Sequence, residues 1–193
     1  MKKIAALVLC LGLAGPAVAQ TFAETRAAAE QGDAKAQVKL GLMYERGRGV
    51  PQDLVQAVAW YRRAADQGNA PAQTSLGLMY MGGQGVPRDD VQAAAWLRKA
   101  ADQEYAHSQF TLGYMYTIGR GVPRDDAQAV MWYRKAADQG NAPAQNNLGL
   151  MYMNGQGVPQ DYGQAAAWLR KAADKGFDTA KEALRKMEAS GHP

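Results

Sequence analysis

Apolar residues recur along most of this chain at the three- and four-residue spacing of helices, in two kinds of stretch that alternate. One face of the first stretch carries Ala36, Leu40, Met43 and Tyr44. An α-helix repeats every 3.6 residues, so such a face is typical of a helix packed on one side. Glycine is the usual residue at a left-handed helix end, so the pattern predicts that this helix ends at Gly47.

The second kind of stretch also predicts a helix, with Ala57, Tyr61 and Ala64 as its apolar stripe. Asp53 precedes it and Gln56 follows three residues later, which is the spacing of a capping box. The same Asp-x-x-Gln spacing recurs at Asp89, Asp125 and Asp161. Glycine closes this helix at Gly68, Gly140 and Gly176, so each pair of stretches predicts two helices joined by a short turn.

The two-helix pattern repeats every 36 residues without insertion or deletion, in the units 34–69, 70–105, 106–141 and 142–177. The tryptophans keep this period, at Trp60, Trp96, Trp132 and Trp168. A repeat of this length predicts an all-α protein in which helix pairs stack as an α/α solenoid. We interpret residues 21–33 as an N-terminal half-unit and residues 178–190 as a C-terminal cap helix, so that residues 20–193 form a single domain.

The first nineteen residues have the layout of a secretory signal peptide. Lys2 and Lys3 precede the apolar run 4–14, and small residues occupy 17–19. This order predicts cleavage after Ala19, and the run is too short to span a bilayer. We therefore expect a periplasmic or secreted protein with no stable membrane insertion after cleavage.

Composition narrows the classes of partner. Removing the signal peptide takes away two lysines and lowers the formal net charge from +4 to +2. No block of basic residues stands out, so we expect no nucleic-acid partner. The single cysteine, Cys10, lies in the signal segment, so the predicted fold is stable without disulfides.

The repeated unit resembles the Sel-one-like repeat, a relative of the tetratricopeptide repeat. The matching motif reads Ala-x-Ala-Gln-x-x-Leu-Gly-x-Met-Tyr-x-x-Gly-x-Gly-Val-Pro-x-Asp, followed by Gln-Ala-x-x-Trp-Tyr-Arg-Lys-Ala-Ala-Asp-x-Gly. The resemblance implies a right-handed superhelix of helix-turn-helix repeats that acts as a scaffold or adaptor. We accordingly expect no enzyme and no cofactor, but a monomer that binds a protein or peptide.

In the related tetratricopeptide fold the first helix of each pair lines the concave groove, and several of the corresponding positions differ between units here. We take varying positions to face solvent, because stacking positions must stay alike. The third unit offers the largest aromatic and apolar set. The predicted partner-binding residues are His107, Phe110, Tyr114, Thr117 and Ile118, flanked by Thr74, Leu78, Met81, Asn146, Leu150 and Met153.

Two other classes of function find less support in the sequence. An envelope hydrolase acting on β-lactams or peptidoglycan would need an activated serine, typically Ser-x-x-Lys, and neither Ser75 nor Ser108 has lysine three residues on. His107 has no second histidine or cysteine nearby, so no metal site is expected. A membrane-surface or polymer-binding module would draw on a methionine stripe, but methionines at the repeat period are more typical of core packing.

Two local predictions follow from comparing the units. Tyr61, Leu97, Tyr133 and Leu169 should lie in the interior, with the preceding tryptophans partly buried. Glu104 and Tyr105 replace the Gly-Asn pair of other units, which places glutamate at a left-handed position and a poor N-cap before the next helix. The joint between the second and third units is therefore predicted to be the least stable.

Overall fold

The computed structural model describes residues 16–191 and contains ten helices and no strand in that range. They are α1 (Pro16–Glu30), α2 (Ala34–Arg46), α3 (Leu54–Asp66), α4 (Ala70–Gly82), α5 (Asp90–Ala101), α6 (Ala106–Ile118), α7 (Asp126–Asp138), α8 (Ala142–Asn154), α9 (Tyr162–Asp174) and α10 (Asp178–Ala189). The predicted all-α class is confirmed. The apolar run 4–14 of the predicted signal peptide lies outside the described residues, and α1 runs across the predicted cleavage position.

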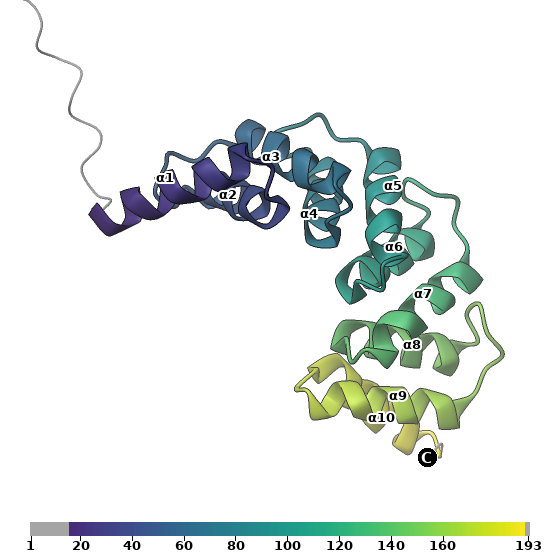
Figure 1. Ribbon diagram of the computed structural model, residues 1–193. Coiled ribbons are helices and arrows are strands. Elements are labelled where there is room, and N and C mark those ends of the chain that lie inside the picture. Colours follow the sequence, from purple (N-terminus) through teal and green to yellow (C-terminus); the bar gives the residue numbers. More distant parts are fainter. Residues whose placement is uncertain (1–15, 192–193) are drawn as a thin grey trace, which may run out of the picture.

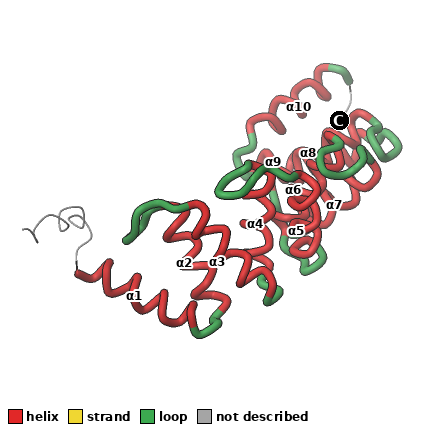
Figure 2. The backbone as a smooth tube through the Cα atoms, turned by 90° about the horizontal axis from the view of Figure 1, so that it is seen from above, coloured by secondary structure: helices red, strands yellow, loops and turns green. Residues whose placement is uncertain are grey.

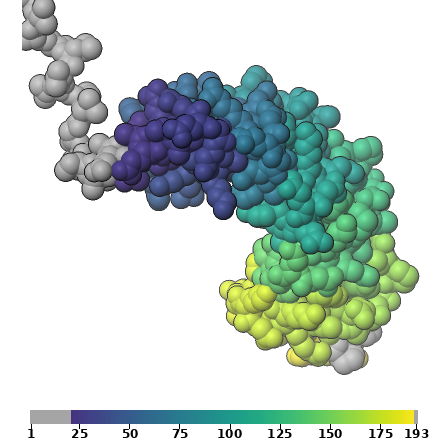
Figure 3. Space-filling view, in the orientation of Figure 1, coloured from purple at the N-terminus to yellow at the C-terminus, as the bar shows by residue number. Residues whose placement is uncertain are grey.

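Consecutive helices pack side by side and build a curved solenoid (Figure 1). The even-numbered helices form an inner row and the odd-numbered helices an outer row (Figure 1). Figure 2 shows from above how the helices follow one another along the solenoid. The space-filling view shows the hollow on the inner side of the curve (Figure 3). The first helix of each unit therefore faces the hollow, as the resemblance implied.

Helix ends follow the predicted chemistry with one correction. Gly47, Gly83, Gly119 and Gly155 end the inner helices in the left-handed conformation. Asp53 accepts a hydrogen bond from the Gln56 amide at 3.0 Å, as an N-cap should. The predicted reciprocal bond of a capping box does not form, because the Asp53 amide instead donates to the Tyr44 carbonyl at 3.0 Å. The turn is thereby tied back to the inner helix of its own unit.

The interior is a series of clusters between helix pairs. Tyr61, Leu97, Tyr133 and Leu169 are all buried, as predicted. The prediction of partly buried tryptophans is right for Trp96 and Trp168 and wrong for Trp60 and Trp132, which are buried. The buried tryptophans are those that precede a tyrosine, so odd and even units pack differently.

Glycines permit two close approaches that stacking requires. A β-carbon on Gly113 would lie 2.8 Å from the ring of Tyr133, so glycine lets α6 and α7 pack closely. A β-carbon on Gly121 would lie 1.9 Å from the carbonyl oxygen of Asp90 in the preceding unit. Gly121 also has a φ of 68°, so both conformation and space demand glycine where one unit meets the next.

A ladder of buried glutamines links inner helices to the outer helices that precede and follow them. Gln109 donates from Nε2 to the Ala101 carbonyl of the preceding unit at 3.1 Å, and its Oε1 accepts from Gln139 at 2.8 Å. The same two bonds form around Gln37 and Gln73. These bonds satisfy polar groups that stacking buries.

The joint between the second and third units has the predicted left-handed residue and lacks a side-chain cap. Glu104 is the only residue other than glycine with positive φ in the described range, at 64°. Tyr105 occupies the N-cap of α6 and makes no side-chain cap hydrogen bond. Asn69 and Asn141, the equivalent residues, each accept one from the following helix. The backbone prediction is confirmed, and its energetic consequence remains a prediction.

Candidate interaction surface

Charge distinguishes the three central helices of the inner row from the other helices of the solenoid. α4, α6 and α8 contain no aspartate, glutamate, lysine or arginine. The outer helices carry exposed cations at each turn of the solenoid, among them Arg98 and Lys99 on α5. Protein surfaces are ordinarily rich in mixed charge, so the uncharged inner face is distinct from the rest of the molecule.

The structure brings most of the predicted residues to this inner face. Tyr114 is 43% exposed and Ile118 is 45% exposed, which places them among the most exposed large apolar side chains of the described chain. His107 is also exposed. The remaining half-buried members are Leu78, Met81, Phe110, Thr117, Leu150 and Met153. The exposed part of the set is thus concentrated on α6.

Thr74 and Asn146 were expected to face solvent, and this expectation is wrong, since both are only 4% exposed. Thr74 Oγ1 lies 2.6 Å from the Ser108 hydroxyl on the next inner helix. Asn146 accepts a hydrogen bond from Thr179 on α10 at 3.1 Å. The position varies between units because each pair of neighbouring inner helices solves its contact differently, not because the position is free.

Phe110 is also less available than predicted. Its ring centroid lies 5.9 Å from that of Tyr133, and it packs against the core cluster of the third unit. Phe110 therefore contributes to folding as well as to the inner surface. Tyr114, four residues on, is the aromatic residue of α6 that faces solvent.

Polar and apolar groups alternate along the inner face, a feature that the sequence prediction missed. The Tyr133 hydroxyl lies 3.3 Å from Thr117 Oγ1 on α6. Burial raises the pKa of Tyr133, and hydrogen bonds with Thr117 and Asn147 act in the opposite direction. The Thr117 hydroxyl on α6 and the Asn147 amide on α8 thus place polar groups from two neighbouring units beside Tyr133.

The first unit repeats this polar arrangement. The Tyr61 hydroxyl donates to Glu45 Oε2 at 2.5 Å. Burial raises the pKa of Tyr61 well above its ordinary value, the hydrogen bond and charge of Glu45 raise it further, and a hydrogen bond with Ser75 acts in the opposite direction. In both odd units, therefore, the hydroxyl of a buried tyrosine bonds a half-buried polar residue of the inner helix.

The even units replace both partners by apolar residues. Met81 packs against the cluster that contains Leu97, and Met153 against the cluster that contains Leu169. The sequence contains this alternation. Units with tyrosine in the outer helix have a polar residue in the inner helix, and units with leucine in the outer helix have methionine there.

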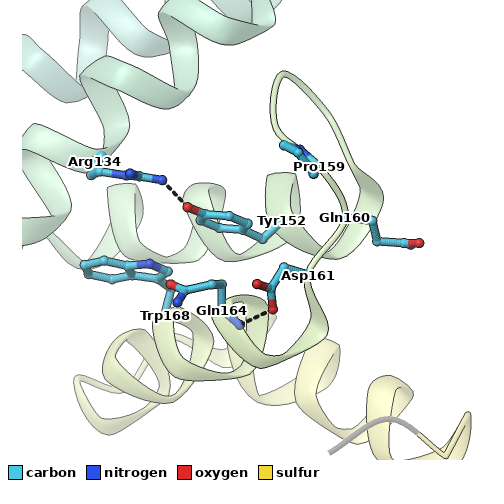
Figure 4. A pocket seen from close by; sticks show the side chains of 7 residues that line it. All are labelled: Arg134, Tyr152, Pro159, Gln160, Asp161, Gln164 and Trp168. Atoms are coloured by element: carbon cyan, nitrogen blue, oxygen red, sulfur yellow. Dashed lines mark hydrogen bonds between the residues drawn. The ribbon is translucent and has the colours of Figure 1, made fainter.

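A cavity of about 470 Å³ opens at the junction of the third and fourth units (Figure 4). Arg134 donates a hydrogen bond to the Tyr152 hydroxyl at its rim, and Trp168 lines it. The same arginine–tyrosine bond recurs at the two preceding junctions. The one carboxylate that lines this cavity belongs to Asp161, which caps α9 by accepting a hydrogen bond from the Gln164 amide at 2.8 Å. The cavity is a product of stacking and lacks the paired groups of an acid–base site.

The described residues contain no cluster of three or more histidine, cysteine, aspartate or glutamate side chains that could hold a metal ion. Ser108 is fully buried and its hydroxyl is bonded to Thr74. Within residues 16–191 no helix has the length and apolar character needed to cross a membrane.

Comparison with known proteins identifies the family of this chain. The family model of the Sel1 repeat matches residues 34–69, 70–105, 106–141 and 142–177. The chain therefore belongs to the Sel1 repeat family, whose solenoids are generally protein–protein interaction folds. No curated protein matches it significantly.

Solved structures agree. A protective antigen present in uropathogenic Escherichia coli strains, which displays an SLR fold, is 43% identical with a TM-score of 0.87 over 89% of this chain and 37% of its own. A Sel1 repeat protein from Oxalobacter formigenes is 41% identical with a TM-score of 0.82 over 88% of this chain and 50% of its own. The chain thus spans half or less of these relatives. Helicobacter pylori cysteine rich protein B, 24% identical with a TM-score of 0.54 over 68% of this chain and 95% of its own, shares the fold.

Proposed function

We propose that this protein is an exported binding module that holds a segment of another protein on the inner face of its solenoid. The observation that carries the proposal is the uncharged inner row α4, α6 and α8, from which Tyr114 and Ile118 project. Aromatic residues at the centre of a concave surface bury much area with few rotatable bonds, so they are frequent binding hot spots.

Export rests on the signal-like layout of residues 1–19. A relative that is a protective antigen supports the same location, since antibodies most readily reach proteins at or beyond the cell surface. The intact mass of the protein from the envelope or medium tests export. A chain that begins at Gln20 is expected, and an uncleaved chain retained in the cytoplasm would contradict this part of the proposal.

Site-specific photocrosslinking in the native host tests the binding face. A photoreactive phenylalanine analogue replaces Tyr114 on α6, and the matched control replaces Met131, which is similarly exposed on the outer helix α7. The proposal predicts a discrete protein adduct from position 114 and none from position 131. Adducts from 131 alone, or none from 114, would place the binding surface elsewhere.

A further inference from the structure

The alternation along the inner face defines the chemistry of the segment that it would hold, if the proposed function is right. The polar groups lie in the first and third units, at Tyr61 with Glu45 and at Tyr133 with Thr117. The apolar groups lie between and beyond them, at Met81 in the second unit and Met153 in the fourth. Neighbouring groups of one kind are therefore two units apart.

The distance between neighbouring inner helices determines how many residues of a bound segment lie between one unit and the next. Neighbouring packed helices lie about 8–10 Å apart, and Thr74 and Ser108 join adjacent inner helices by a direct hydrogen bond. A polyproline II helix advances about 9 Å in each turn of three residues. Every third side chain of such a segment would face the groove, one over each unit.

Other backbone conformations match less well. A β-strand directs residues three apart to opposite faces, so it would not present one side chain to each unit. An α-helix satisfies its own backbone hydrogen bonds, whereas a polyproline II backbone leaves them free for outside partners. The half-buried side chains of Thr117 and Asn147 are suitable partners on the inner face.

The end of the inner row adds a charge preference. Lys35, Lys39 and Arg46 are exposed on α2, and Glu45 of the same helix is held by Tyr61. The row thus changes from positive at α2 to uncharged at α4, α6 and α8. A segment complementary to it carries an acidic residue at the end that lies over α2.

We infer that the inner face recognises a polyproline II segment of a partner protein, with apolar side chains six residues apart over Met81 and Met153, a hydrogen-bonding side chain midway between them, and negative charge at the end that lies over α2. The inference goes beyond the proposed function by specifying the ligand. A partner bound through a folded surface would leave the proposed function intact and remove this inference.

Synthetic peptides test the spacing on the unmodified protein. A proline-rich host peptide carries a glutamate near one end and two leucines five, six or seven positions apart, with serine three positions after the first leucine, and its affinity is measured by fluorescence anisotropy. Spacings of five and seven turn one leucine by about a third of a turn away from the groove, so each should weaken binding about tenfold. Equal affinities, a maximum at five or seven, or no binding by any peptide would overturn the inference, as would tighter binding by a helical peptide with leucines fourteen apart.

An exchange of groups within the chain tests the register. Thr117→Met together with Tyr133→Leu gives the third unit the pair that Met81 and Leu97 already form in the second. The test uses the peptide whose two leucines are six positions apart. With leucine in place of the serine between them, this peptide should bind the variant more tightly than with serine, which reverses the preference of the unchanged protein. An unaltered preference in a folded variant would contradict the assigned register. Replacing the acidic residue by lysine should weaken binding to the unchanged protein, and no loss would count against the charge assignment.

Discussion

Gln139 donates a hydrogen bond from its Nε2 to the buried Oε1 of Gln109 at a distance of 2.8 Å, so the end of an outer helix is tied to the inner helix of its own unit. The fourth unit has Lys175 where the others have this glutamine. Lys175 instead donates to the Gly140 carbonyl at 2.5 Å, and Gln145 Oε1 is buried without a hydrogen-bond partner.

Lys175→Gln should therefore stabilise the protein. The new side chain can donate to Gln145 Oε1 as Gln139 does to Gln109, and satisfying a buried acceptor is worth about 1 kcal/mol. The melting temperature should rise by about 2–4 °C. Gln139→Lys is the matched control and should lower it. A melting temperature unchanged in both variants would mean that the ladder adds nothing to stability.

Glu104→Gly should also raise the melting temperature. A left-handed conformation costs a residue with a β-carbon about 1–2 kcal/mol, and the greater freedom of glycine in the unfolded chain offsets part of the gain. We expect a net gain of about 1 kcal/mol in the free energy of unfolding. Glu104→Ala removes the charge and keeps the β-carbon, so an equal gain there would assign the effect to charge rather than backbone strain.

Gly121→Ala should destabilise the solenoid far more than Gly68→Ala. Both glycines have positive φ, but only a β-carbon at Gly121 meets a neighbour, the Asp90 carbonyl oxygen at 1.9 Å, whereas Gly68 has nothing within 4 Å. The expected loss in unfolding free energy is more than about 3 kcal/mol for Gly121→Ala and about 1 kcal/mol for Gly68→Ala. Chemical denaturation measures both, and similar losses would show that the second unit does not press against Gly121.

Asp90 makes stability depend on pH at the same junction. Hydrogen bonds from Arg120 and Arg88 lower the pKa of this carboxyl to about 2, and Arg120 Nε lies 2.8 Å from Asp90 Oδ1. Because the folded pKa lies below the value of about 3.9 in unfolded chains, the contribution is complete above about pH 4 and disappears as the pH falls through about 2. The difference in urea midpoint between the unchanged protein and Asp90→Asn should shrink over that range. A difference that stays constant with pH would contradict the assignment.

Local rules explain what the sequence could predict. The glycine ends of the inner helices, the interior position of Tyr133 and the left-handed Glu104 depend on residues within one unit, and the structure confirms all three predictions. Contacts between units could not be derived in the same way. Thr74 varies along the repeat and is nevertheless buried, because the inner helices approach closely enough for it to bond Ser108.

The candidate surface also combines features that the sequence predicts with contacts that it does not. The periodic pattern placed Phe110 and Tyr114 on one helix face, but it could not tell which of two residues four apart lies against the outer helix. The structure packs Phe110 on Tyr133 and leaves Tyr114 exposed. That choice depends on the angle between α6 and α7, which a one-dimensional pattern does not contain.

The measurement that bears most directly on the central claim is the affinity of the crosslinked partner for surface variants. Tyr114→Ala combined with Ile118→Ala removes the exposed apolar pair of α6, while Met131→Ala removes a similarly exposed side chain from α7. We expect the inner-face pair to weaken partner binding about tenfold or more, a loss above about 1.4 kcal/mol, with an unchanged melting temperature. The Met131→Ala variant should bind like the unchanged protein. Full affinity in the inner-face variant, or an equal loss in the control, would contradict binding on the inner face.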